Sequence, residues 1–150
     1  MNEIINTNLI TLDLEAENKE DVISKMARLI DENGNLDSYD DFVESVLMRE
    51  DKTSTGVGSE ISIPHGKSKG VKKAAVAFAR LDKAIDWKSF DGKKVKLVFL
   101  LAVPEASESS EHLKILSTLS RNLLNDDFKK NLLKAEDKEN VNSIIQNIFA

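Results

Sequence analysis

Residues 95–103 read VKLVFLLAV, and this stretch holds the longest uncharged apolar run of the chain, Leu97 to Val103. Large and β-branched apolar residues without polar alternation are typical of a strand that is covered on both faces. The run is also far shorter than the ~18 residues that a membrane-spanning helix requires. We therefore predict a deeply buried strand here, which follows a turn at residues 90–93 and an earlier strand over residues 74–81.

Helices are predicted on either side of these strands. Apolar residues recur at helical spacing over residues 19–33, where Asn18 can cap the first turn and Gly34 can end the helix. The same spacing predicts a helix over residues 39–49, a long helix over residues 110–125, and two shorter helices at the C-terminal end.

The segment between the second helix and the strands is expected to be mostly irregular. Residues 51–59 are polar and contain two glycines, so we predict a loop there. Ile61 to Pro64 is then expected to form a short strand that ends at His65. Helices before, between and after short strands indicate an α/β protein. We predict that residues 1–150 form a single-domain sandwich, whose mixed, mostly parallel sheet of about five strands is flanked by helices on both faces.

Composition excludes several classes of protein. The 150 residues include 21 basic and 26 acidic side chains, a net charge of −5, and no cysteine. Without cysteine there is no disulfide, iron–sulfur cluster or thiolate zinc site, and we expect a cytoplasmic protein without a secretion signal. The acidic balance argues against general binding of nucleic acid, which depends on Lys and Arg.

Two glycine-containing runs resemble nucleotide-binding loops but do not fit them. The run GVG at 56–58 would need a third glycine at Ile61, and the predicted strand follows the glycines instead of preceding them. The run GKS at 66–68 would need its leading glycine at that same position. A zinc site would require both histidines and a carboxylate, which makes it a minor alternative, and we expect no metal and no cofactor.

His65 is the main candidate for chemistry. It precedes Gly66 and lies between the hydroxyl-bearing residues 53–55 and lysines at positions 67, 69, 72 and 73. An imidazole with an ordinary pKa near 6.5 is largely unprotonated at neutral pH, so it can accept a phosphoryl group and release it again. Nearby N–H and hydroxyl groups could donate to the phosphoryl oxygens. A lone histidine without a role is nevertheless common, and local spacing leaves both interpretations open.

Two further residues are weaker candidates. His112 lies near the predicted start of the long helix, where a neutral imidazole could donate to an anion, although an ordinary polar residue is also common there. Arg49 could bind phosphate at the end of the second helix, but an arginine also suits the negative end of a helix dipole.

An ordered set of short motifs spans nearly the whole chain. The set comprises Arg49-Glu50, TGVG at 55–58, ISIPH at 61–65, IDW at 85–87, DGK at 91–93, VFL at 98–100, VPE at 103–105, and His112-Leu113. It resembles the enzyme IIA domains of the bacterial phosphoenolpyruvate-dependent sugar phosphotransferase system, fructose/mannitol class.

The resemblance implies a phosphotransferase component that works as a phosphocarrier in sugar uptake. His65 would accept the phosphoryl group from HPr as a tele-phosphohistidine and pass it to an enzyme IIB, although the residues alone do not fix the ring nitrogen. The link to a membrane enzyme IIC would be indirect. His112 and Arg49 would stabilise the phosphoryl charge, and Thr55 and Gly66 would contact the phosphate. No nucleotide, metal or nucleic-acid partner is implied, and the sugar is not identified.

Two positions depart from the family pattern. Where G-x-G-I-A-I-P-H is usual, this chain has Glu60 and Ser62. Glycine permits a positive φ and close approach of the backbone, so Glu60 adds bulk and charge near the phosphate. In a regular strand, positions 60 and 62 would face away from Ile61, Ile63 and His65, and we expect activity to survive.

Two other functions stay open. A regulatory, nitrogen-type enzyme IIA-like protein would also carry phosphate on His65, but it would act through phosphorylation-dependent binding. A passive binding module would never be phosphorylated, and Glu60 makes this conceivable. Labelling of His65 by phospho-HPr separates the binding module from the two phosphorylated alternatives, and transfer to an enzyme IIB separates those two.

Overall fold

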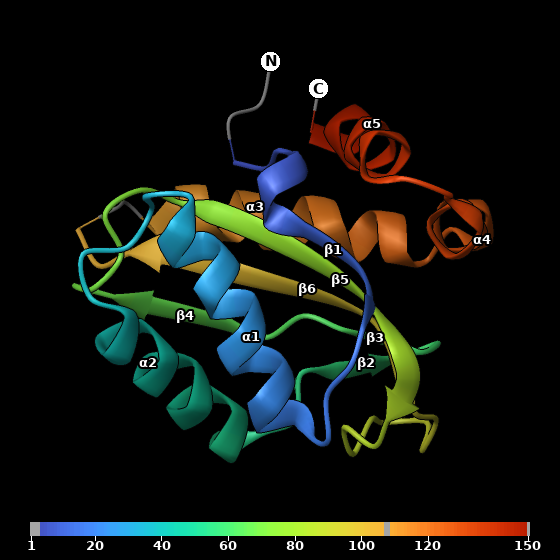
Figure 1. The fold of residues 1–150 in the computed structure, drawn as a ribbon. Helices are drawn as coiled ribbons and strands as arrows, with labels where there is room; N and C mark the ends of the chain where they lie inside the picture. The colour runs from blue at the N-terminus through green and yellow to red at the C-terminus, as the bar shows by residue number, and fades with distance from the viewer. Residues whose placement is uncertain (1–3, 107–108, 150) are drawn as a thin grey trace.

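The computed structural model describes residues 4–106 and 109–149, and at residues 109–112 it describes the backbone alone. Figure 1 shows its helices and strands. In chain order they are η1 (a short 3-10 helix, Thr7–Leu9), β1 (Ile10–Leu14), α1 (Lys19–Glu32), α2 (Tyr39–Lys52), β2 (Gly56–Gly58), β3 (Ile61–Ser62), β4 (His65–Ser68), β5 (Ala75–Ile85), β6 (Val95–Pro104), α3 (Ser109–Leu123), α4 (Asp126–Lys134) and α5 (Lys138–Phe149).

The strands form one mixed sheet. Its order is β1-β5-β6-β3-β2, and β4 continues the edge that β3 begins, because both strands pair with β6. The pairs β1–β5, β3–β6 and β4–β6 are parallel, whereas β5–β6 and β2–β3 are antiparallel. The predicted mixed, mostly parallel sheet is confirmed, with six strands among the residues that the structure describes.

Helices cover both faces of the sheet, as predicted. Figure 1 shows α1 and α2 against one face and α3 on the other, with α4 and α5 beside α3. The long strands β5 and β6 lie at the centre, and Phe78 and Phe99 on them pack edge to face with ring centroids 5.1 Å apart. Residues 97–103 are all buried, because a strand between two helical layers needs apolar side chains on both faces.

The first two helices begin at the predicted residues, Lys19 and Tyr39. The side chains of Asn18 and Ser38 each accept the backbone N–H of the residue three positions later. α2 continues beyond Arg49 and ends at Lys52, so the predicted loop begins later than expected. Within residues 4–106 and 109–149, no helix is long and apolar enough to cross a membrane.

Two expectations for residues 51–65 are wrong. Residues 51–59 are not all loop, because β2 pairs with β3 as an antiparallel hairpin. The strand does not end at His65 either. Pro64 has no N–H to donate to the sheet, so the strand is interrupted there, and His65 opens β4. β1 is a further strand that the sequence pattern did not indicate.

Candidate functional site

His65 lies at the start of β4, opposite Leu101 of β6, with its side chain half-buried. Its Nδ1 is 3.0 Å from the backbone oxygen of Ile63. A carbonyl oxygen can only accept a hydrogen bond, so Nδ1 carries the proton and donates it. In this tautomer the lone pair of the neutral ring is on Nε2, which makes Nε2 the nucleophilic nitrogen.

The surroundings of His65 favour the neutral ring. Burial is the largest influence and lowers the pKa of His65 below its ordinary value of 6.5. The hydrogen bond to Ile63 and the charge of Glu50 raise this pKa, whereas the charge of Arg49 lowers it, and the net shift is downward. Because only the unprotonated imidazole is a nucleophile, the site keeps His65 in its reactive form at neutral pH.

Arg49 lies in the last turn of α2, near enough to His65 to influence its charge. Its Nη1 donates to the backbone oxygen of Thr53 at 2.8 Å, which holds the guanidinium against the loop that follows the helix. The structure therefore brings together two of the predicted site residues from different elements. A guanidinium within electrostatic range of a nucleophilic imidazole is suited to an anionic substrate, because its planar donor fork matches phosphate oxygens.

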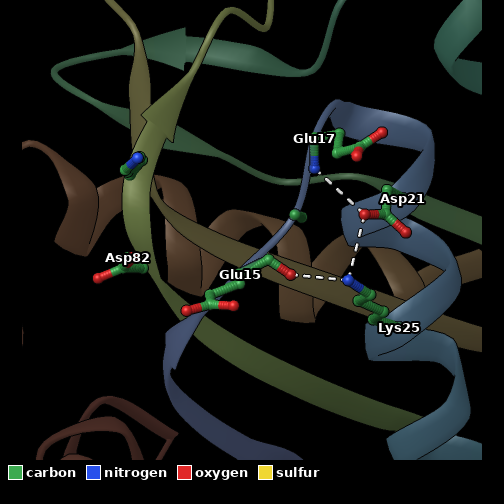
Figure 2. Close-up of a pocket in the computed structure, with 7 residues that line it drawn as sticks. Glu15, Glu17, Asp21, Lys25 and Asp82 are labelled. Carbon is green, nitrogen blue, oxygen red and sulfur yellow. Dashed lines mark hydrogen bonds and ion pairs between the residues drawn. The ribbon is translucent and has the colours of Figure 1, made fainter.

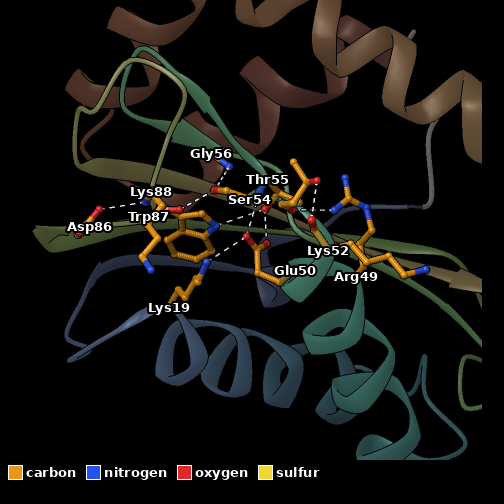
Figure 3. A network of polar contacts seen from close by, with 11 residues as sticks. Lys19, Arg49, Glu50, Lys52, Ser54, Thr55, Gly56, Asp86, Trp87 and Lys88 are labelled. Atoms are coloured by element: carbon orange, nitrogen blue, oxygen red, sulfur yellow. Dashed lines mark hydrogen bonds and ion pairs between the residues drawn. The ribbon is translucent and has the colours of Figure 1, made fainter.

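A buried carboxylate next to Arg49 had no predicted role. Glu50 is 6% exposed, and its Oε2 accepts the backbone N–H of Thr55 at 2.9 Å while its Oε1 accepts the Thr55 hydroxyl at 2.5 Å. Figure 3 shows this network, in which Lys19 Nζ also approaches Oε2, at 3.3 Å. A sequence signal existed, since position 50 continues the buried stripe of α2 that contains Phe42 and Val46 at a spacing of four.

The two predicted phosphate contacts lie in tightly packed positions. The Thr55 hydroxyl donates to Glu50 and accepts the indole N–H of Trp87 at 3.2 Å, so this side chain belongs to the buried network. At Gly66, a Cβ would lie 2.3 Å from Ser45 Oγ, so glycine is required for α2 to pack on β4. Contact of either residue with phosphate stays a prediction.

His112 is placed on α3 by its backbone, but its side chain lies outside what the structure describes. Its predicted contact with the phosphoryl group therefore stays a prediction. Among the described residues, no group of three or more histidine, aspartate or glutamate side chains is arranged to hold a metal ion.

A separate hollow lies between the start of α1 and β5, and Figure 2 shows it. Its lining residues are Glu15, Ala16, Glu17, Asp21, Lys25, Asp82 and Lys83. Lys25 Nζ bridges the backbone oxygen of Glu15 at 2.8 Å and the Asp21 carboxylate at 3.2 Å, and the N–H of Glu17 donates to the same carboxylate. Several of its polar groups thus bind one another, and it contains neither His65 nor Arg49.

The condition that Glu60 lies in a regular strand with Ser62 is not met, because Glu60 lies in a turn. Ser59 and Glu60 form the turn between β2 and β3, and both have positive φ, 55° and 71°. The Glu60 carboxylate forms an ion pair with Lys129 of α4 at 3.0 Å. A left-handed backbone explains why glycine suits this position. Ser62 is fully buried in β3, and its hydroxyl has no hydrogen-bond partner among the residues that the structure describes.

We expect Glu60→Gly to be more stable than Glu60→Ala by about 1 kcal/mol, because both variants lose the ion pair and only alanine keeps the left-handed strain. Chemical denaturation of the two variants measures the difference. Phosphoryl transfer to His65 is expected to stay within about 2-fold of the parent in both, because Lys129 already neutralises the carboxylate. Equal stability of the two variants would show that the turn is not strained.

Comparison with known proteins shows the family of the chain. A family model described as "Phosphoenolpyruvate-dependent sugar phosphotransferase system, EIIA 2" matches residues 3–148. The fructose-specific EIIA component of Haloferax volcanii is 39% identical over 93% of this chain and 90% of its own length. The fructose-specific EIIABC component of Bacillus subtilis is 37% identical over 95% of this chain, which spans only 22% of that longer protein.

Solved structures share the fold. The nitrogen regulatory protein IIA-Ntr from Neisseria meningitidis has a TM-score of 0.87 and 34% identity, over 95% of this chain and 96% of its own. The mannitol enzyme IIA of Escherichia coli, solved in complex with phosphorylated mannitol enzyme IIB, has a TM-score of 0.81 over 95% and 97% of the two chains. At 21% identity, the second likeness concerns the fold alone.

Proposed function

The chain belongs to the EIIA 2 family of the phosphoenolpyruvate-dependent sugar phosphotransferase system, and from this premise we propose that it is a phosphocarrier that works through His65. The observation that carries the proposal is the state of this histidine. Its ring is half-buried beside Arg49, its Nδ1 proton is held by Ile63, and its pKa lies below the ordinary value.

The chemistry is an in-line transfer of the phosphoryl group. The lone pair of His65 Nε2 forms the new N–P bond while the bond between phosphorus and the donor atom of phospho-HPr breaks, and that donor atom keeps the released electron pair. The Nδ1–H group of His65 stays hydrogen-bonded to the backbone oxygen of Ile63. This hydrogen bond stabilises the positive charge that the ring gains. Arg49, and His112 from α3, would stabilise the phosphoryl oxygens during transfer.

We place HPr before this protein and an enzyme IIB after it, so that contact with a membrane enzyme IIC is indirect. The mannitol enzyme IIA that shares the fold was solved with its phosphorylated enzyme IIB, which supports the second partner. The fructose-specific names of the relatives from Haloferax volcanii and Bacillus subtilis favour uptake of fructose or a similar sugar.

A regulatory role is the second candidate. The structure of IIA-Ntr from Neisseria meningitidis combines a TM-score of 0.87 with 34% identity over nearly the whole chain. In that role His65 would be phosphorylated in the same way, and the phosphorylation state would control binding to another protein. The two roles differ in whether the phosphoryl group reaches an enzyme IIB.

Phosphoryl transfer from phosphoenolpyruvate through enzyme I and HPr tests the proposal. The modified residue is located by mass spectrometry under conditions that preserve acid-labile phosphohistidine, and we expect the label on His65. Onward transfer to purified fructose enzyme IIB then separates transport from regulation. If HPr is demonstrably phosphorylated and this protein stays unlabelled, the phosphocarrier function is refuted and the passive binding module is favoured.

We expect the rate of His65 phosphorylation to reach a plateau on the alkaline side of the pKa of His65 and to fall as the pH drops through that pKa, because protonation removes the lone pair of Nε2. The midpoint should lie below 6.5, since burial lowers the pKa of His65. Initial rates with phospho-HPr prepared beforehand measure this profile, and hydrolysis of phospho-HPr at each pH serves as the control. A midpoint above 6.5 would contradict the environment described for His65.

A further inference from the structure

Glu50 is connected to His65 through a series of hydrogen bonds. The Glu50 carboxylate accepts both the backbone N–H and the hydroxyl of Thr55. The backbone oxygen of Thr55 accepts the N–H of Ile63 at 3.0 Å, and the backbone oxygen of Ile63 accepts Nδ1–H of His65, also at 3.0 Å. The carboxylate on α2 is therefore linked in three steps to the ring that we propose to be phosphorylated.

We propose that Glu50 is a positioning residue, which fixes the Nδ1–H tautomer of His65 by holding Thr55 and, through it, the carbonyl of Ile63. This inference rests on the proposed function, in which Nε2 is the acceptor. Glu50 does not touch the phosphoryl group. Its effect is to keep the acceptor carbonyl of Ile63 in a place that only one tautomer of the ring can satisfy.

The chemistry of Glu50 explains why a carboxylate is needed. A buried charge is costly unless its oxygens are hydrogen-bonded, and here both oxygens receive donors from Thr55 and one also receives Lys19. Every neighbour in this set is a donor, so two acceptor oxygens are required. Glutamine has one acceptor oxygen and would direct its NH2 group at a donor, although its size is nearly the same.

Other hydrogen bonds of the network hold Thr55 and its neighbours in place if the Glu50 carboxylate is lost. Trp87 Nε1 donates to the Thr55 hydroxyl at 3.2 Å, and the indole is fully buried. Ser54, the preceding residue, donates to the backbone oxygen of Trp87 and accepts the N–H of Gly56 at 3.0 Å. Figure 3 shows these groups converging on the segment between α2 and β2. A change at Glu50 is therefore expected to displace the backbone of Thr55 and, through it, the carbonyl of Ile63.

Glu50→Gln tests the proposal on the unphosphorylated full chain. Imidazole nitrogen shifts measured by NMR report which ring nitrogen of His65 carries the proton. We expect mainly Nδ1–H in the parent and a mixture of both tautomers in Glu50→Gln. We also expect phosphoryl transfer from phospho-HPr to fall about 10- to 100-fold, because small misplacements of a reacting group are costly.

Thr55→Val provides a second variant if Glu50→Gln does not fold. It removes the hydroxyl and keeps the backbone N–H, so we expect a smaller shift in the tautomer, whereas Thr55→Ser should restore the parent tautomer. Tyr39→Phe is the stability control. It removes a hydrogen bond of 2.8 Å between α2 and the backbone oxygen of Ser24, with no link to Ile63, and should leave the tautomer unchanged.

The outcomes separate this inference from the proposed function. A folded Glu50→Gln or Thr55→Val protein in which His65 keeps the parent tautomer would overturn the role of Glu50, whatever the transfer rate. A tautomer change in a protein whose parent form never accepts phosphate would support the positioning role and refute the phosphocarrier function. A stability loss like that of Tyr39→Phe without a tautomer change would also overturn the inference and show a structural role only.

Discussion

His65→Ala is expected to take up no phosphoryl group from phospho-HPr, with the label falling below detection. The imidazole is the proposed nucleophile, and alanine has no lone pair with which to form the N–P bond. We expect the fold to survive, because the half-buried side chain makes a hydrogen bond to Ile63 that is worth only about 1 kcal/mol. Phosphopeptide mapping and thermal unfolding of the same sample measure both effects.

Lys83→Ala is a suitable control for the handling of labile phosphohistidine. Lys83 is exposed on β5 and lines the separate hollow, so its variant should be labelled as fully as the parent. If His65→Ala is still labelled at the parent level, the acceptor is another residue and the proposed function must be revised. The unfolding measurement shows whether a lost label reflects the missing imidazole or an unfolded protein, and only a folded, unlabelled His65→Ala supports the assignment.

Much of the fold could be predicted because its central pattern is strong. Residues 97–103 carry apolar side chains for both faces of a strand, and the caps at Asn18 and Ser38 place the starts of two helices. The hairpin of β2 and β3 could not be predicted in the same way. Gly56 is required in β2 because a Cβ there would lie 2.3 Å from Ser89 Oγ. Glycine usually indicates a loop, so this packing between distant residues makes the sequence of a strand look like that of a loop.

β1 was missed for a similar reason. The strand has only five residues, Ile10–Leu14, and Asp13 within it has a positive φ of 59°, which breaks the regular alternation of side chains. Its position comes from pairing with β5, where the register shifts between Thr11 and Leu14. The pairing partner β5 is distant in the sequence, so the local pattern around residues 10–14 could not predict this short irregular strand.

The candidate site was predicted in part. Residue types made His65 and Arg49 candidates for phosphate chemistry, and the resemblance of the ordered motifs, not local spacing, implied their roles. The structure places them on β4 and α2, close enough to interact electrostatically. The role of Glu50 could not be found from local sequence, although its place on the buried stripe of α2 was a usable signal. Its partner Thr55 also accepts the indole N–H of Trp87, and these contacts between distant residues exist only in the folded chain.

Arg49→Ala is expected to slow phosphoryl transfer to His65 by about 10²- to 10³-fold, the usual effect of removing one donor that stabilises charge in a transition state. Arg49→Lys should recover only part of this loss, because an ammonium keeps the charge but cannot reproduce the planar fork of a guanidinium. Single-turnover transfer from phospho-HPr, with stability measured alongside, gives the two rates.

An independent readout separates the charge of Arg49 from its structural contact. The guanidinium lowers the pKa of His65, so this pKa should rise in Arg49→Ala and stay close to the parent value in Arg49→Lys. The lost bond to the backbone oxygen of Thr53 should matter little, because Thr53 is exposed and water can replace the donor. A rate within about 3-fold of the parent in Arg49→Ala, well inside the loss expected for a transition-state donor, would mean that the arginine only makes its contact with the backbone oxygen of Thr53 and that the phosphoryl charge is stabilised by other groups.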